Sequence, residues 1–329
     1  MQVTIVSNTS RKLAGWTEAF EIMRGAAHTV TDPGPVTTVE GAMALVQDAD
    51  ALFVGLNPIT REVLEAAVRA RVVARPGVGM DNVDAVAATE LGILVCNTPG
   101  SNADSVADHT LGMVLGLIRK LPEQDLRTRT GKGWSDGPMV APQLTGKRVA
   151  ILGTGNVGRG VARRMRGFGV TLVGYDPLRD PAFAAEVGLA YLPFPEVLRG
   201  AHVVTVHVPL FKDTEGLLGA AELALLNPGA IVIAISRAGV VDETALLEAL
   251  QSGHLGGAGV DVWATEPLLE HPLYGMPNTI LSAHTAGFSP EAATRARVMA
   301  AESVVAALRG EPRNIFNPEV LKTPQARLR

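Results

Sequence analysis

The sequence contains a single cysteine, Cys96, so neither an intrachain disulfide nor a cysteine-based metal cluster can form within it. Its apolar neighbours Ile93, Leu94 and Val95 indicate a buried side chain rather than a nucleophile. No apolar run reaches the roughly 20 residues that a membrane span needs. Residues 1–6 lack the basic region of a signal peptide and read as a first strand. Together these absences favour a protein of the reducing cytoplasm that does not bind a membrane.

The chain also lacks a large excess of charge of either sign. Its 29 lysines and arginines stand against 33 acidic residues, a formal net charge of −4. Such a balance provides no basic surface, so nucleic acid is not an expected partner. What the chain does have is 47% hydrophobic residues and 35 glycines, a composition typical of α/β enzymes. A length of 329 residues favours two domains over one.

Short apolar runs alternate with helical periodicity along most of the chain. In the first hundred residues the pattern predicts strands at 3–7, 51–56, 72–75 and 93–96, with helices at 61–70 and 83–91 between them. A long amphipathic helix is expected from Asn102 to Pro122. Residues 127–142 are polar and glycine-rich, and we interpret them as a surface excursion around Trp134. Residues 312–329 are predicted to be a mobile tail.

The second half repeats the rhythm and predicts about six strands. They are expected at 149–152, 170–175, 202–208, 231–236, 257–262 and 278–283, and a helix is expected at 290–310. Strands that alternate with helices form parallel sheets covered on both faces. The fold class predicted is therefore α/β, with two Rossmann-like, doubly wound parallel-sheet domains.

The most informative stretch is Gly153-x-Gly155-x-x-Gly158, which lies between a predicted strand and a predicted helix. The first glycine permits a tight turn, the second lets the backbone approach a pyrophosphate, and the third lets helix and strand pack closely. The amino end of the following helix offers N–H groups and partial positive charge to phosphates. The order strand, glycine turn and helix therefore predicts a dinucleotide site.

Asp176 closes the next strand, 18 residues after Gly158. A carboxylate there can accept both ribose hydroxyls and would repel a 2′-phosphate, which favours NAD over NADP. Arg179 stands close enough in sequence to keep NADP open, and an ordinary surface aspartate is the plain alternative.

A second candidate binding turn follows the strand at 72–75. Arg75 precedes the glycine-rich run Gly77-Val78-Gly79, where exposed N–H groups beside a guanidinium would suit an anionic substrate. A turn whose arginine caps backbone carbonyls explains the same residues equally well.

Three strand ends in the second half carry the side chains that a hydride transfer from a secondary alcohol needs. Arg237 can pin a substrate carboxylate and polarise a carbonyl, His284 can accept the hydroxyl proton, and Glu266 can hold the imidazole. No metal is needed for this chemistry, and none is expected. Each residue also has an ordinary structural explanation, and His207, at another strand end, shows how easily a histidine misleads.

Four motifs, in order, identify the chain as similar to the NAD-dependent D-2-hydroxyacid dehydrogenases. They are the glycine motif with Asp176, then 236–243, 259–268 and 283–287, and residues 75–84 and 97–100 resemble the same family's substrate domain. The resemblance implies a discontinuous, flavodoxin-like substrate domain formed by 1–102 plus 288–329, an NAD-binding domain at 103–287, and a homodimer formed through the NAD-binding domain.

The resemblance also implies the role of each site residue. The catalytic residues would be Arg237, Glu266 and His284. The NAD-binding set would be Gly153, Gly155, Asn156, Val157, Gly158, Asp176, Val208, Pro209, Asp261 and Ala286. The substrate carboxylate or phosphate would be held by Arg75, Val78, Gly79 and Asn102, with Arg237.

Two positions depart from the family pattern. Ala238 stands where glycine usually follows the catalytic arginine, and we expect its methyl group to crowd the backbone. Asp108 stands where the interdomain helix usually has glutamate, a change expected to be tolerated.

The expected activity is hydride transfer between NAD and a D-2-hydroxy acid, most like that of 3-phosphoglycerate dehydrogenase. No regulatory domain follows in the sequence, so serine feedback is not expected. Hydroxypyruvate or glyoxylate reductase and phosphite dehydrogenase are alternatives on the same scaffold, as is a non-catalytic NAD-sensing corepressor. An amino-acid dehydrogenase is disfavoured, because no lysine sits at the strand ends.

Overall fold

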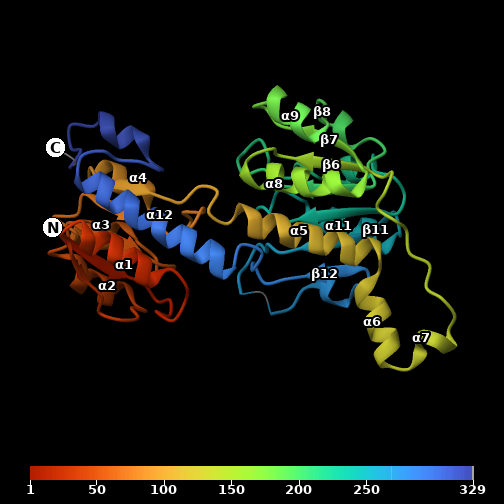
Figure 1. Cartoon of the computed structure of the whole chain (residues 1–329), viewed down its shortest axis with the longest axis horizontal. Helices are drawn as coiled ribbons and strands as arrows, with labels where there is room; N and C mark the ends of the chain where they lie inside the picture. Colours follow the sequence, from red (N-terminus) through yellow and green to blue (C-terminus); the bar gives the residue numbers. More distant parts are fainter. Residues whose placement is uncertain (268, 328–329) are drawn as a thin grey trace. The chain divides into compact units, whose positions relative to one another are not determined.

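The computed structural model describes residues 1–267 and 269–327, which form two compact units (Figure 1). Unit 1 comprises Met1–Asn102 and Phe288–Arg329, and unit 2 comprises Ala103–Gly287. The chain therefore leaves unit 1, builds all of unit 2, and returns. Leu268, the last residue of the 259–268 motif, and the tail residues Leu328 and Arg329 lie outside the described residues.

Unit 1 is built on a parallel sheet of five strands within the described residues, in the order β2-β1-β3-β4-β5. The flavodoxin-like order of doubly wound sheets is the same, with its reversal between β1 and β3. The elements are β1 (Gln2–Val6), α1 (Trp16–Gly25), β2 (Thr29–Thr31), α2 (Val39–Val46), β3 (Ala51–Val54), α3 (Arg61–Ala66), β4 (Val72–Ala74), α4 (Ala85–Glu90), β5 (Leu94–Cys96), α12 (Pro290–Leu308) and the 3-10 helix η4 (Pro318–Lys322).

Helices cover both faces of this sheet, which explains why its strands are apolar throughout. On β1, Val3 and Ile5 join the cluster shared with α1 and α12, whereas Val6 joins the cluster shared with α2, α3 and α4. In Figure 1, α12 lies along α1, although the two are far apart in sequence. The carboxy-terminal segment is thus part of the unit 1 core.

The prediction of a mobile tail is wrong for the described part of residues 312–329. The Asn317 side chain is buried, accepts a hydrogen bond from the Val95 N–H at 2.7 Å and donates to the Ile93 carbonyl at 3.1 Å. The backbone N–H of Asn97 donates to the Asn314 carbonyl. These bonds fix the segment against β5. The sequence pattern missed them because they join residues more than 200 positions apart.

Unit 2 is built on a parallel sheet of seven strands among the residues described, in the order β12-β11-β10-β9-β6-β7-β8. About six were predicted, and the short β8 was missed. The elements are α5 (Ala103–Ile118), α6 (Leu121–Arg129), α7 (Lys132–Ser135), β6 (Arg148–Leu152), α8 (Asn156–Met165), η1 (Arg166–Phe168), β7 (Thr171–Tyr175), α9 (Pro181–Val187), β8 (Leu189–Tyr191), η2 (Glu196–Leu198), β9 (Val203–Val206), α10 (Ala220–Leu223), β10 (Ala230–Ala234), α11 (Glu243–Gln251), β11 (Leu255–Val260), η3 (Pro272–Gly275) and β12 (Thr279–Leu281).

The strand order of unit 2 reverses between β6 and β9, which lie side by side in the sheet. The chain runs outward from β6 through β7 to β8, then returns to β9 and runs outward the other way. Ligands of open parallel sheets bind at such a reversal, outside the carboxyl ends of the strands. The prediction of two doubly wound α/β folds is confirmed, and the topology points to this edge of unit 2.

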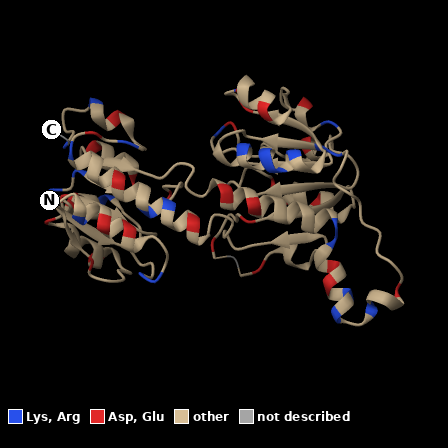
Figure 2. Cartoon of the chain, in the orientation of Figure 1, with Lys and Arg blue, Asp and Glu red and all other residues tan. Residues whose placement is uncertain are grey.

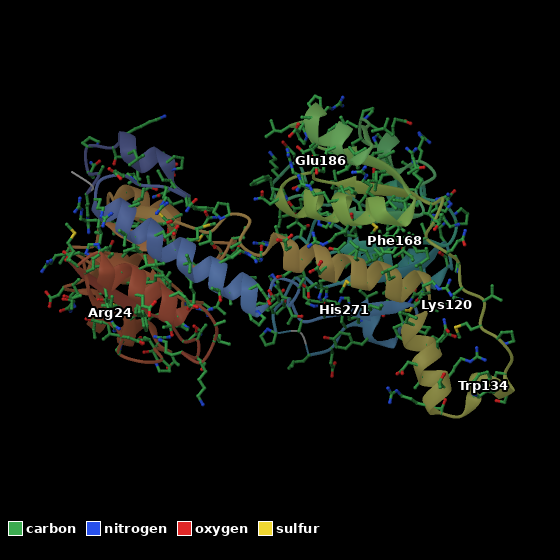
Figure 3. The ribbon with its side chains drawn as sticks, viewed as in Figure 1. Arg24, Lys120, Trp134, Phe168, Glu186 and His271 are labelled. Atoms are coloured by element: carbon green, nitrogen blue, oxygen red, sulfur yellow. The ribbon has the colours of Figure 1, made fainter. Side chains whose placement is uncertain are left out.

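The segment between α5 and β6 differs from its prediction. The long helix ends at Ile118 rather than at Pro122, and Pro122 instead lies in the first turn of α6, where a missing N–H costs nothing. Residues 127–142 are not all irregular, because α6 and α7 cover part of them. Figure 3 shows Trp134 at the far end of this arm, and the side chain is 94% exposed. None of the described helices is long and apolar enough to cross a membrane.

Candidate active site

The three motif glycines in unit 2 occupy three different environments. Gly153 follows β6 in the left-handed region at φ +88°, where a side chain would be strained. A Cβ atom on Gly158 would fall 1.9 Å from the Gly153 carbonyl oxygen, so the space between helix α8 and the turn admits no side chain at this position. A Cβ atom on Gly155 would meet nothing within 4 Å. Packing therefore explains Gly153 and Gly158, whereas Gly155 borders open space.

Asp176 lies directly after β7 and is fixed to the glycine turn. Its Oδ2 accepts hydrogen bonds from the Thr154 N–H at 2.7 Å and from the Thr154 hydroxyl at 3.2 Å, and its Oδ1 accepts from the Leu178 N–H at 2.8 Å. The Thr154 hydroxyl also lies 2.8 Å from the Tyr191 hydroxyl of β8. The carboxylate is thus held beside the turn. Sequence reasoning missed Thr154, although it is the side chain between the first two glycines.

These residues fit a dinucleotide. Gly155 and Asn156 are exposed where α8 begins, and the first N–H groups of a helix have no partner within it. The open space beside Gly155 would admit a pyrophosphate, and the half-buried Asp176 carboxylate stands at the next strand end. Val208 and Pro209 follow β9, on the other side of the strand-order reversal. The Cβ position on Gly153 would fall 2.9 Å from the Val208 nitrogen, so the two strand ends are in contact.

His207 behaves as a structural histidine in this edge. Its Nε2 is buried, its backbone N–H donates to the Leu152 carbonyl at 2.7 Å, and burial lowers the pKa of the imidazole to about 3. It is therefore neutral at ordinary pH.

His284 and Glu266 meet beyond the carboxyl ends of β12 and β11, on the opposite side of the strand order from β7 and β8. The Nδ1 atom of His284 lies 2.9 Å from Oε2 and 3.0 Å from Oε1 of Glu266. A carboxylate only accepts, so Nδ1 carries the proton and Nε2 of the neutral ring is the basic atom. Both side chains are partly exposed, at 45% and 40%. Glu266 Oε1 also accepts from the Trp263 N–H at 3.2 Å. The predicted pair is thus brought together with its basic nitrogen available.

Asp261 fixes the loop that carries His284. It is 1% exposed, its Oδ1 accepts from the Thr285 N–H at 2.8 Å, and its Oδ2 accepts from the Ala286 N–H at 3.0 Å. The His284 N–H donates to the Asp261 carbonyl at 2.8 Å. These bonds hold His284 at φ +54°, a conformation uncommon for a residue other than glycine. In this structure the Asp261 carboxylate therefore binds protein N–H groups, including that of Ala286, another predicted site residue.

Arg237 follows β10, next to β11 and β12 in the sheet, so Arg237, Asp261 and His284 leave neighbouring strand ends. Its Nη1 donates to the Ser236 carbonyl at 2.9 Å, and the side chain is half-buried. Gly239, not Ala238, has the left-handed φ of +86°. Ala238 lines a small cavity with Val241 and Leu246. The effect of its methyl group on the backbone stays a prediction.

Arg75 lies in unit 1, directly after β4, in the turn predicted to bind an anion. Its Nη1 donates to the Gly79 carbonyl, and its backbone N–H donates to the Cys96 carbonyl. Val78 and Asn97 are joined through the Val78 carbonyl and the Asn97 side-chain amide at 2.8 Å. The contact with Gly79 is the carbonyl cap of the plainer alternative, although a guanidinium has five N–H donors and can bind an anion as well. Asn102 ends the first segment of unit 1.

Asp108 joins the helix that opens unit 2 to the helix of the glycine motif. Its carboxylate lies 2.6 Å from Arg164 of α8, and Asp104 lies 3.1 Å from the same guanidinium. Figure 2 shows the acidic start of α5 beside the basic α8. Asp108, although shorter than the glutamate usual at this position in the family, thus still reaches Arg164.

The chain matches one family model over residues 111–286, described as D-isomer specific 2-hydroxyacid dehydrogenase, NAD binding domain. D-3-phosphoglycerate dehydrogenase of Mycobacterium leprae is 40% identical over 270 residues, which is 82% of this chain but 51% of the relative. The chain thus spans about half the length of that relative. Glyoxylate reductase of Korarchaeum cryptofilum is 39% identical over 283 residues, 84% of this chain and 85% of the relative.

Solved structures show the same fold. A protein of Thermus thermophilus is 33% identical with a TM-score of 0.83, over 96% of this chain and 100% of its own. A glyoxylate reductase of Paecilomyes thermophila is 25% identical with a TM-score of 0.84, over 97% of this chain and 98% of its own.

Proposed function

The chain belongs to the D-isomer specific 2-hydroxyacid dehydrogenase family, and from that premise we propose that it interconverts a D-2-hydroxy acid and its 2-keto acid with NAD. The observation that carries this proposal is the contact of His284 Nδ1 with both oxygens of Glu266, at 2.9 and 3.0 Å. It leaves Nε2 as the basic atom on a fixed ring, which is what the removal of a hydroxyl proton requires.

Each residue of unit 2 has a separate task in this reaction. In the oxidation direction, His284 Nε2 accepts the proton of the substrate hydroxyl while Glu266 stabilises the imidazolium that forms. In the reduction direction, the same imidazolium returns the proton to the carbonyl oxygen. Arg237 binds the substrate carboxylate and polarises the carbonyl. The bound cofactor would accept the hydride as NAD in the oxidation direction and supply it as NADH in the reduction direction. The glycine turn, Asn156 and Val157 would hold its pyrophosphate, and Asp176 its ribose.

For the substrate we propose the 3-phosphoglycerate class. The 40% identity to phosphoglycerate dehydrogenases supports it, as does the arginine–glycine turn of unit 1, where Arg75, Val78, Gly79 and Asn102 would hold a carboxylate or phosphate. Glyoxylate reductase is the second candidate, because a relative of that name is 39% identical over nearly its whole length.

The test is oxidation of NADH at 340 nm with glyoxylate, hydroxypyruvate and 3-phosphohydroxypyruvate, with reduction of NAD by phosphite as a further arm. We expect the highest kcat/KM with the phosphorylated keto acid, and Arg75→Ala to raise its KM more than that of glyoxylate. Binding of NADH without turnover of any of these compounds would favour the NAD-sensing protein over the dehydrogenase.

We also propose a homodimer formed through unit 2. The arm of α6 and α7 supports it, because Leu121, Leu126, Trp134 and Val140 are 52–94% exposed there. Sedimentation equilibrium should give twice the chain mass of 34.4 kDa. We propose a cytoplasmic location because the sequence has a single cysteine, Cys96, which is free and buried, so no intrachain disulfide calls for an oxidising compartment. Cell fractionation would test that location.

A further inference from the structure

We propose that His109 is a positioning residue for His284, and that it acts through Ser282 and Asp261. The inference rests on the proposed function, in which His284 moves the substrate proton. His109 lies on α5, and the other two residues lie at the carboxyl ends of β12 and β11. All belong to unit 2.

The direction of the hydrogen bonds follows from the number of protons. His109 Nε2 lies 3.0 Å from the Ser282 hydroxyl, and that hydroxyl donates to Oδ1 of Asp261. A hydroxyl has one proton to donate, and Ser282 donates it in the hydrogen bond to the Asp261 carboxylate. Ser282 must therefore accept from His109, so Nε2 of His109 carries a proton. The imidazole of α5 thus fixes the rotation of the Ser282 hydroxyl toward Asp261.

Asp261 passes this constraint to the catalytic loop. Its buried carboxylate accepts from the N–H groups of Thr285 and Ala286, directly after His284. A buried carboxylate is stabilised by each oriented donor, and the loss of one loosens the others. Ser282 is also linked to Glu266 through Trp263. The Trp263 indole N–H donates to the Ser282 carbonyl at 2.8 Å, and the Trp263 backbone N–H donates to the Glu266 carboxylate. Both members of the catalytic pair therefore depend on the residue that His109 contacts.

The end of the sheet proposed to hold the pyrophosphate and ribose of NAD is separate from this network, although Asp261 and Ala286 belong to both the network and the predicted NAD-binding set. The glycine turn and Asp176 follow β6 and β7, whereas Ser282 and Asp261 follow β12 and β11. Loss of the His109 donor should therefore misplace the imidazole without changing the pyrophosphate and ribose contacts. A displacement of a few tenths of an ångström is expected to lower kcat on the order of tenfold.

Two substitutions distinguish positioning from packing. His109→Phe keeps a ring but removes the donor, whereas His109→Gln keeps an N–H group at a similar reach. Thr110→Val is the matched control, because Thr110 donates only within its own helix, to the Val106 carbonyl at 2.7 Å. We expect His109→Phe to lower kcat roughly tenfold with a smaller change in NADH affinity, because the pyrophosphate and ribose contacts are kept. His109→Gln should recover most of the loss, and Thr110→Val should match the wild type.

The proposal is overturned if His109→Phe retains the wild-type kcat, or if His109→Gln is as impaired as His109→Phe. Ser282→Ala should have the same effect as His109→Phe, and the double variant should be no worse than either single one, because one chain of bonds is broken in each. Additive losses would show that the two residues act separately.

A measurement without turnover separates this proposal from the proposed function. The chain has seven histidines, so long-range ¹H–¹⁵N spectra of the imidazoles can be assigned by single substitutions. We expect His109 to be protonated at Nε2, and the His284 signals to shift in His109→Phe and Ser282→Ala but not in Thr110→Val. If no keto acid is reduced, the proposed function fails and the spectra still decide the positioning role. A His109 ring protonated only at Nδ1, or an unmoved His284, would contradict it.

Discussion

Gly158 lies so close to Gly153 that a Cβ atom on Gly158 would come within 1.9 Å of the Gly153 carbonyl oxygen. Gly155, between them in sequence, borders open space. One glycine motif thus combines a packing requirement at Gly158 with the proposed binding role of Gly155, and the two can be tested separately.

Alanine substitutions should divide the motif in this way. Gly158→Ala forces α8 away from β6 and is expected to lower the free energy of unfolding by about 2–4 kcal/mol. Gly155→Ala, at φ −71°, fits its backbone and should leave the melting temperature near that of the wild type, but weaken NADH at least tenfold because its methyl group occupies the phosphate approach. Calorimetry and fluorescence titration measure the two effects. Equal stability of both variants would refute the assignment.

Asp176 should set the cofactor preference by its charge. Asp176→Asn keeps an oxygen that can accept from the Thr154 N–H, so the turn should remain in place while the repulsion of a 2′-phosphate disappears. We expect weaker NADH binding and a smaller gap between NADH and NADPH, and the same for Asp176→Ala with a looser turn. Glu196→Gln, which removes an exposed acidic charge bonded to Arg199, is the control. An unchanged preference would show that another residue reads the ribose.

His284→Ala should lower kcat by roughly 10²–10⁴-fold with little change in NADH affinity, because it removes the proton acceptor but not the dinucleotide contacts. Glu266→Gln should also lower kcat, but by a smaller factor, since the imidazole ring of His284 is kept. His254→Gln is the control, because it removes an imidazole that lies against the Leu223 carbonyl, outside the proposed site, and it should retain full activity. Stopped-flow and steady-state rates with the best keto acid decide the matter, and wild-type turnover in His284→Ala would remove the acid–base assignment.

His207 should make the protein less stable in acid. Its folded pKa of about 3 lies below the ordinary value of 6.5, so between these values the unfolded chain binds a proton that the folded chain refuses. The free energy of unfolding should therefore fall with decreasing pH below about 6.5, by up to about 1.4 kcal/mol per pH unit from this group. Desolvation also lowers the pKa values of His28 and His202, which adds in the same direction.

Urea denaturation between pH 7 and 4.5 measures this effect, with His207→Gln as the comparison. The variant keeps the contributions of His28 and His202, so its slope against pH should be shallower than that of the wild type by the His207 share. Parallel slopes would mean that folding does not lower the pKa of His207.

The edge of unit 2 could be predicted from local pattern. Strand, glycine turn, helix and acid follow one another within 30 residues, so the pattern from Gly153 to Asp176 can be recognised from neighbouring residues alone. Arg237, Glu266 and His284 could be named because each follows an apolar strand. The mobile tail was predicted wrongly, because the bonds of Asn317 to β5 join segments more than 200 residues apart. The exact ends of α5 and α6 were missed for a different, local reason, since Pro122 fits both the end of one helix and the start of the next.

By itself the sequence determined the two α/β sheets, the dinucleotide motif and the identity of the polar residues at the strand ends, because period and spacing are properties of neighbours along the chain. Only the tertiary structure decided which atoms meet. It placed His284 Nδ1 on Glu266, turned the Asp261 carboxylate into the anchor of the 284–286 loop, and brought His109 from α5 to Ser282. The reason is that hydrogen bonds depend on direction and on distances of about 3 Å, which folding sets and sequence spacing does not.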